Sequence, residues 1–289
     1  MLYCRVPWLR CVDVRGADAY DFLRRQLTND PPAADDRFAL AAWNDAKGRV
    51  RALFRIVRGT EGPLLIAERD GLDTVLAKLR IFVLRSDVVL EPSDVEVGAV
   101  IGDARRLLQA RGIALGSDPG SASRAEDLLW LRQGDELLYV AGVAPALERL
   151  AAELEPGTPD RAALAEIRAG LPYVGSTLAE RYVPQMLNLD RLGGVAFDKG
   201  CYPGQEVVAR LHHLGSVKRR LKRFAAEGAA PSAPPPGAPI VDASGNEVGD
   251  VVRAAAVGET LELLAVVQLD AAAPLFAGGG DKVPLKAVD

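Results

Sequence analysis

The sequence is poor in the residues that hold metals and form disulfides. Its 289 residues include three cysteines, Cys4, Cys11 and Cys201, and two histidines, His212 and His213. A disulfide scaffold, a zinc ribbon or a ferredoxin-type cluster held by this chain alone needs more of these residues. Thiol chemistry would therefore rest on one cysteine, and no resident metal is expected.

Long apolar runs and a large excess of one charge are also missing. No stretch approaches 18 consecutive apolar residues, so we expect no membrane-spanning helix and no membrane partner. The first residues read directly into strand-like sequence, so we expect no secretory signal. A formal net charge of −4 argues against a protein that coats nucleic acid by bulk electrostatics. Unpaired cysteines favour a reducing compartment, and the predicted location is the cytoplasm.

The composition, with 49% hydrophobic and 26% charged residues, is that of a globular protein. Apolar residues at helical spacing predict a helix over 17–27, and a Thr-Pro pair predicts another that begins at Thr158 and ends near Gly170. A hairpin is expected over 38–57. Strands and helices follow one another without regular alternation or a Gly-rich dinucleotide fingerprint, so the predicted fold class is α+β.

A Pro-rich segment, 226–239, divides the chain into two predicted parts. Proline of this density disfavours helix and central strand, so the segment is expected to be a linker or an extended loop. Residues 1–225 would form an α+β body, with two subdomains as an option. Residues 240–289 read as short strands of a small β-barrel, which we expect to pack on the body because such a short unit is marginal alone.

Two clusters of basic residues allow more than one interpretation. Strand alternation places Arg49, Arg51 and Arg55 on one face, which is either a solvated sheet face or a cationic wall for an anionic ligand. The run 218–223 is either an edge strand guarded by positive charge or a surface for RNA or an acidic partner. The neighbouring His212 and His213 diverge in any regular structure, so this pair alone predicts no metal site.

The densest motif surrounds Cys201. It reads KGCYPGQE over 199–206 and precedes a helical-looking segment. Gly200 and Gly204 allow backbone conformations closed to other residues, and Pro203 suits the first turn of a helix. Cys201 is therefore expected on a tight turn before a helix N-terminus, where backbone N–H groups and Lys199 would stabilise a thiolate. The alternative is a buried structural cysteine, the interpretation preferred for the other two.

This motif and several distant segments resemble the YgfZ-type folate-binding proteins, relatives of the glycine-cleavage T-protein, an aminomethyltransferase. The matching segments are 16–19, 22–23, 26–30, 45–49, 167–172, 184–189, 192–197 and 199–206, with Arg210. The similarity covers essentially the whole chain, and the Cys-centred motif is its specific part. It implies a ring-like α+β body with a C-terminal β-barrel, arranged around a central pocket for tetrahydrofolate or a derivative, with no permanent metal.

The resemblance also implies a function. It points to an accessory protein for the assembly, repair or activity of iron–sulfur enzymes, including radical enzymes that modify tRNA. The expected partners are these client enzymes and folate, with tRNA involved only indirectly. Cys201 would be the functional thiol, with Lys199 beside it, and would contact a cluster only transiently. The residues holding the turn would be Gly200, Tyr202, Gly204, Gln205, Glu206 and Arg210. The folate contacts would be Trp8, Asp45, Lys47 and Arg168.

Two departures from the family pattern bear on activity. In the T-protein the strand after the hairpin turn presents a carboxylate needed for methylene transfer, and residues 49–52 contain none. This counts against the alternative function, a folate-dependent aminomethyltransferase-like transferase, and leaves open whether the protein is an enzyme. Many family members carry Glu where this chain has Arg168. Arginine offers only donors, which weakens the expected pterin contact but suits a carboxylate tail.

Overall fold

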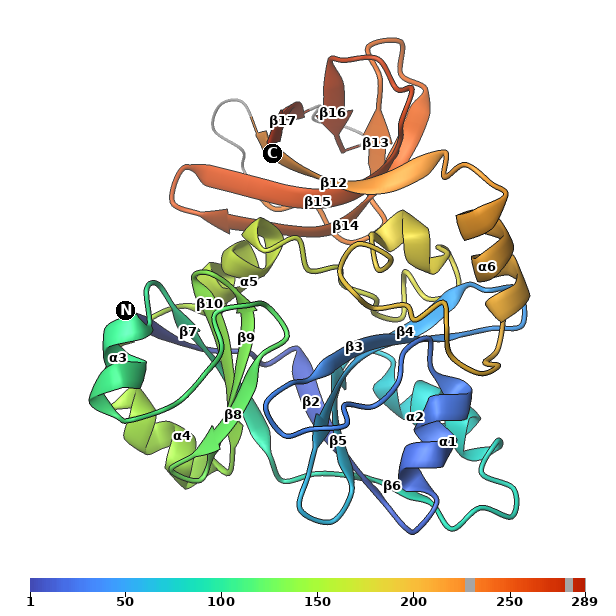
Figure 1. Cartoon of the computed structure of the whole chain (residues 1–289). Coiled ribbons are helices and arrows are strands. Elements are labelled where there is room, and N and C mark those ends of the chain that lie inside the picture. Colours follow the sequence, from blue (N-terminus) through green and yellow to red (C-terminus); the bar gives the residue numbers. More distant parts are fainter. Residues whose placement is uncertain (227–231, 279–282, 289) are drawn as a thin grey trace.

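The computed structural model describes residues 1–226, 232–278 and 283–288. Two α+β lobes and a C-terminal β-barrel surround a central region in a ring-like arrangement (Figure 1). The predicted α+β class, ring-like body and C-terminal barrel are confirmed.

The first lobe is an antiparallel five-stranded sheet with two helices on one face. Its elements are β2 (Leu9–Arg15), α1 (Ala19–Gln26), β3 (Ala39–Asn44), β4 (Val50–Arg58), β5 (Pro63–Glu68), α2 (Leu72–Arg80) and β6 (Val89–Pro92), with the strands in the order β3-β4-β5-β2-β6. The helices bury Phe22, Leu23 and Leu76 against Trp43 and Phe54 of the sheet. The predicted first helix is α1, and the predicted hairpin is formed by β3 and β4.

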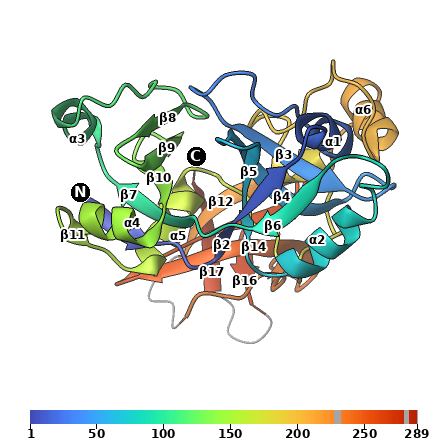
Figure 2. The ribbon, with the colours of Figure 1, turned by 90° about the horizontal axis from the view of Figure 1, so that it is seen from below.

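The second lobe is a six-stranded sheet that includes the N-terminal strand. Its elements are β1 (Leu2–Arg5), β7 (Glu96–Ile101), α3 (Arg105–Ala110), β8 (Ala122–Ala125), β9 (Leu128–Gly134), β10 (Leu137–Gly142), α4 (Ala144–Ala151) and β11 (Glu155–Pro156), with the strands in the order β11-β1-β7-β10-β9-β8. Trp130, Leu138, Leu147 and Leu150 form its own core. From below, α3 and α4 lie on the outer side of this lobe, while α1 and α2 lie on the outer side of the other (Figure 2).

Three short helices follow the second lobe, namely α5 (Pro159–Arg168), the 3-10 helix η1 (Pro184–Leu187) and α6 (Gln205–His213). As predicted, α5 begins with Thr158 in extended conformation at the N-cap and proline at the first helical position. Ile167 of α5 shares a core with Leu53 of the first lobe and Val252 of the barrel, so this helix lies where the modules meet. No helix in the described ranges is long and apolar enough to cross a membrane.

The barrel is closed by six strands in the order β12-β15-β14-β13-β16-β17. They are β12 (Arg219–Ala226), β13 (Pro239–Val241), β14 (Glu247–Val257), β15 (Thr260–Gln268), β16 (Leu275–Ala277) and β17 (Val283–Val288). The barrel therefore begins before residue 240, because β12 precedes the Pro-rich segment and pairs with both β15 and β17. Within the basic run, residues 219–222 pair with β15 alone among the described strands, and Arg223 pairs with β17 as well, so the expected edge position holds for most of the run. Residues 227–231 of the predicted linker lie outside the described residues.

Candidate functional site

The loop before α6 exposes one thiol. Cys201 is exposed, whereas Cys4 and Cys11 are buried in the sheets of the lobes. Burial raises the pKa of the Cys11 thiol to about 12, which keeps that group protonated at neutral pH. Among the cysteines of this chain, Cys201 is thus the one that another molecule can reach.

Lys199 anchors this loop to the first lobe. Its side chain is 1% exposed, and its Nζ donates hydrogen bonds to the carbonyl oxygens of Arg24 and Leu27, at 2.7 and 2.8 Å. It also forms an ion pair with Asp30 Oδ1 at 3.1 Å. Burial lowers the pKa of Lys199, and the Asp30 carboxylate opposes that shift. The ammonium group thus caps the C-terminal end of α1. It also lies 5.6 Å from the ring centre of Tyr202.

Two glycines bring the loop against the hairpin turn. Gly204 has φ +75°, and a Cβ there would lie 2.4 Å from Cα of Gly48, so glycine is required. Gly200 has no positive φ, and a Cβ there would meet nothing within 4 Å. The expectation that Gly200 adopts a conformation closed to other residues is therefore wrong. The expectation is confirmed for Gly204.

The remaining motif residues support the loop or lie exposed. Tyr202 is buried, and Gln205 Nε2 lies 3.4 Å from the carbonyl oxygen of Lys199. Glu206 and Arg210 are exposed on α6. In the neighbouring hairpin turn, Asp45 Oδ1 accepts hydrogen bonds from the backbone N–H groups of Lys47 and Arg49, each at 2.8 Å, while Lys47 is exposed. The structure therefore places two predicted folate contacts, Asp45 and Lys47, beside the motif loop.

The other two predicted folate contacts lie on or beside α5. Trp8 donates from Nε1 to Glu166 Oε1 at 3.2 Å. Arg168 is about half exposed and donates from Nε and a terminal nitrogen to Glu262 Oε1 of the barrel, at 2.9 and 2.7 Å. Arg168 thus joins α5 to β15.

Glu166 is a charged residue at the junction of the three modules. It is 1% exposed and accepts hydrogen bonds from Trp8 and from the hydroxyl of Tyr139 in the second lobe. Its other oxygen pairs with Arg253 of the barrel at 2.5 Å, and the guanidinium of Arg253 stacks 4.4 Å from the Trp8 ring. Sequence reasoning missed Glu166 and Arg253, because their partners are 27 to 158 residues away along the chain.

The three arginines of the hairpin, Arg49 just before β4 and Arg51 and Arg55 within it, differ in environment. Arg51 Nε pairs with Glu180 Oε1 at 2.7 Å, and Arg49 reaches the backbone oxygen of Glu180 at 3.2 Å. Arg55 is 3% exposed and donates from Nε to Gln133 Oε1 of the second lobe at 2.8 Å. A solvated face is therefore wrong for Arg55.

Glu68 lies in the same buried region as Arg55. Burial raises the pKa of Glu68 to about 7, and the charge of Arg55 partly opposes this shift. The one local sign in the sequence is a carboxyl residue at the end of the otherwise apolar strand β5, and it does not identify the partners.

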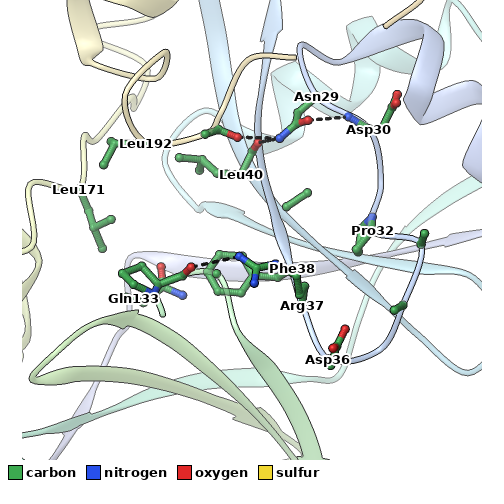
Figure 3. Close-up of a pocket in the computed structure, with 16 residues that line it drawn as sticks. Asn29, Asp30, Pro32, Asp36, Arg37, Phe38, Leu40, Gln133, Leu171 and Leu192 are labelled. Atoms are coloured by element: carbon green, nitrogen blue, oxygen red, sulfur yellow. Dashed lines mark hydrogen bonds between the residues drawn. The ribbon is translucent and has the colours of Figure 1, made fainter. Parts of the chain in front are cut away.

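A cavity of about 440 Å³ lies between the first lobe, the second lobe and the segment after η1 (Figure 3). Phe38, Leu40, Leu171 and Leu192 give it apolar walls, and Asp30, Arg37 and Gln133 are among its polar residues. The side-chain amide of Asn29 fixes one wall by donating to the backbone oxygens of Leu40 and Gly193, at 3.0 and 2.7 Å. This is a concave, largely apolar site with few polar groups, as small-molecule sites are.

Arg220 of the basic run and the two histidines make contacts within the fold, whereas Lys218 and Lys222 are exposed. Arg220 forms two hydrogen bonds with the Asp190 carboxylate, at 3.0 and 2.8 Å, and joins β12 to the segment after η1. His212 stacks on Phe197, with ring centres 3.7 Å apart. No group of three or more potential metal ligands occurs among residues 1–226, 232–278 and 283–288.

The fold has counterparts among solved structures. No protein-family model matches the chain. The glycine cleavage system aminomethyltransferase T from Bartonella henselae is similar with a TM-score of 0.75 and 17% sequence identity, over 99% of this chain and 84% of that protein. The heterotetrameric sarcosine oxidase from Corynebacterium sp. U-96, in complex with pyrrole 2-carboxylate, matches 54% of this chain and 85% of its own at 15% identity and a TM-score of 0.38. The first match shows a T-protein-like fold, as predicted.

Proposed function

We propose that this protein is a folate-binding accessory factor of the YgfZ type, which supports the assembly, repair or activity of iron–sulfur enzymes, including radical enzymes that modify tRNA. The observation that carries this proposal is one exposed cysteine, on the loop before α6, in a chain whose T-protein-like fold extends over 99% of its length. The clients would bind at the exposed loop, and folate would bind in the central cavity.

The residues of the cavity fit a tetrahydrofolate, although none of the four contacts predicted from the sequence, Trp8, Asp45, Lys47 and Arg168, lines it. The cavity volume of about 440 Å³ lies in the usual range for small-molecule sites. Phe38, Leu40 and Leu192 would flank the pterin ring system, the amide of Gln133 would hydrogen-bond it, and Arg37 at the exposed rim would pair with a glutamate carboxylate. When bound, the folate supplies a carrier for one-carbon units, while these side chains orient it and exclude water.

Cys201 would contact the iron–sulfur clusters of the client enzymes. A thiolate on an exposed loop is a suitable soft ligand for an iron atom of a client's cluster. The loop is attached to the first lobe by the buried Lys199 and by the close contact between Gly204 and Gly48. A single thiol suits transient contact with a client's cluster, because permanent clusters usually need four ligands.

Titration with tetrahydrofolate tests the folate part of this proposal. The chain has three tryptophans, so intrinsic fluorescence reports on binding. We expect a saturable change in the wild type and also in Arg168→Gln, because Arg168 pairs with Glu262 of the barrel. An unsaturable response in the folded wild type would contradict the proposal.

A folate-dependent one-carbon transferase is the second candidate, because the matched fold belongs to an aminomethyltransferase. Such a reaction needs a carboxylate near the folate nitrogen to handle protons. Residues 49–52 contain none, and one Asp45 oxygen accepts two backbone hydrogen bonds of its own turn. We therefore expect no turnover of methylene-tetrahydrofolate with an aminomethyl donor, and sustained turnover would favour this candidate over the first.

A further inference from the structure

Gln133 lies at the junction of two adjoining cavities. Besides the cavity already described, a second one of about 510 Å³ is lined by Arg161 and Arg168 of α5. The two cavities share Pro119, Gln133 and Leu192 among their lining residues. Gln133 itself is 5% exposed, so its amide is a buried polar group on the wall that the two cavities share.

Arg55 determines which way this amide faces. Arg55 Nε lies 2.8 Å from the amide oxygen of Gln133, and a guanidinium can only donate hydrogen bonds. The oxygen of the amide is therefore fixed on Arg55, and the NH₂ group is left as a donor. That nitrogen, Nε2, is buried and has no hydrogen-bond partner among the described residues. An unpaired buried donor is costly, which makes it a site prepared for an acceptor.

We propose that Gln133 Nε2 donates a hydrogen bond to the 4-oxo group of the bound pterin ring and so selects 4-oxo folates over 4-amino analogues. This inference rests on the proposed folate binding. The 4-oxo group is the strong acceptor on the edge of a tetrahydropterin, whereas a 4-amino group presents N–H donors to the same amide. Two facing donors leave both groups unpaired, so the analogue should be rejected.

Arg55 is the positioning residue in this arrangement. It does not line either cavity, and it acts through the orientation of the Gln133 amide. Its guanidinium lies 5.0 Å from the centre of the Tyr139 ring, and the nearby Glu68 carboxyl also affects its charge environment. The buried arginine of β4 thus connects the first lobe to the ligand-facing amide of the second.

The test compares calorimetric Kd values for tetrahydrofolate and 4-amino-4-deoxytetrahydrofolate at pH 8. We expect the wild type to bind the 4-oxo compound about 10- to 100-fold more tightly. Gln133→Glu offers an acceptor in place of the donor and should reverse this preference. Gln133→Met, similar in volume but without polar atoms, should bring the two Kd values together. Gln109→Glu, on an exposed position of α3, is the matched control and should keep the wild-type preference.

The ratio of the two Kd values separates this role from a general structural one, because a packing defect weakens both ligands alike. Arg55→Met should reduce the ratio, and Arg55→Lys, which can still donate to the amide oxygen, should largely restore it. A ratio unchanged in Gln133→Glu and Gln133→Met would overturn the assignment while folate binding stands. Absence of binding by either ligand to the wild type would overturn the proposed function itself.

Discussion

The loop of Cys201 and the junction around Glu166 both hold a buried charge, yet they are built differently. Lys199 is satisfied by three oxygens of residues 24–30, all from one stretch of the first lobe. Glu166 is satisfied by donors from the first lobe, the second lobe and the barrel. The loop therefore depends on two segments of the first lobe, the end of α1 and the hairpin turn at Gly48, whereas the junction depends on all three modules. From this difference we expect substitutions at the junction to destabilise the protein more than substitutions in the loop.

The largest loss of stability is expected when the junction around Glu166 is disrupted. Replacing Glu166 by Ala leaves Arg253, whose side chain is 12% exposed, as an uncompensated buried charge. Breaking a buried pair in this way costs about 3–5 kcal/mol of unfolding free energy, measured by urea denaturation. Glu148→Ala, at an exposed position of α4, is the control and should stay within about 0.5 kcal/mol. A loss below about 1 kcal/mol at Glu166 would show that the junction does not hold the modules together.

The next effect depends on pH and comes from Glu68. Its pKa is raised from 4.5 to about 7 in the folded protein. The folded state therefore binds the extra proton more strongly, so this contribution to stability is complete below pH 4.5 and is lost as pH rises through 7. The shift corresponds to about 3 kcal/mol at most. Denaturation from pH 4 to 8 should show that Glu68→Gln flattens this decline; an identical pH profile in the variant would be the contrary result.

A smaller loss of stability is expected when glycines of the loop are replaced, and it should differ between Gly204 and Gly200. Gly204→Ala should cost about 2 kcal/mol, because φ is +75° and the new Cβ would collide with Gly48. Gly200→Ala meets open space and should change stability by less than about 0.5 kcal/mol. Thermal and urea unfolding of the two variants provide the measurement. Equal losses would mean that the contact with the hairpin turn does not position the loop.

The sequence allowed prediction of features set by nearby residues. The start of α5 at Thr158, the turn at Gly204 and the strand character of the hairpin all depend on local backbone preferences. Prediction from the sequence failed where the structure depends on pairing between residues that are far apart along the chain. Nothing near β12 in the sequence shows that residues 223–226 pair with β17 and close the barrel. Arg55 looked solvated, because its partner Gln133 lies 78 residues further along the chain.

In the candidate site, too, locally determined features could be predicted and long-range contacts could not. Cys201 and its loop follow from one short motif, whereas the buried groups of the central region come from five or more separate strands and helices. Arg168 illustrates the limit, since its partner Glu262 on β15 lies 94 residues away. A polar residue at the end of an apolar strand, such as Glu68, is the one local sign that a buried network exists, and it does not name the partners.

The central claim is that the exposed thiol of Cys201 is what supports iron–sulfur enzymes. The direct measurement is the activity of these enzymes in a strain lacking the protein, complemented with Cys201→Ser or with the buried-cysteine control Cys11→Ala at equal protein levels. We predict that Cys11→Ala restores the activities and that Cys201→Ser does not, although its tetrahydrofolate affinity matches that of the wild type. Full restoration by Cys201→Ser would contradict the account.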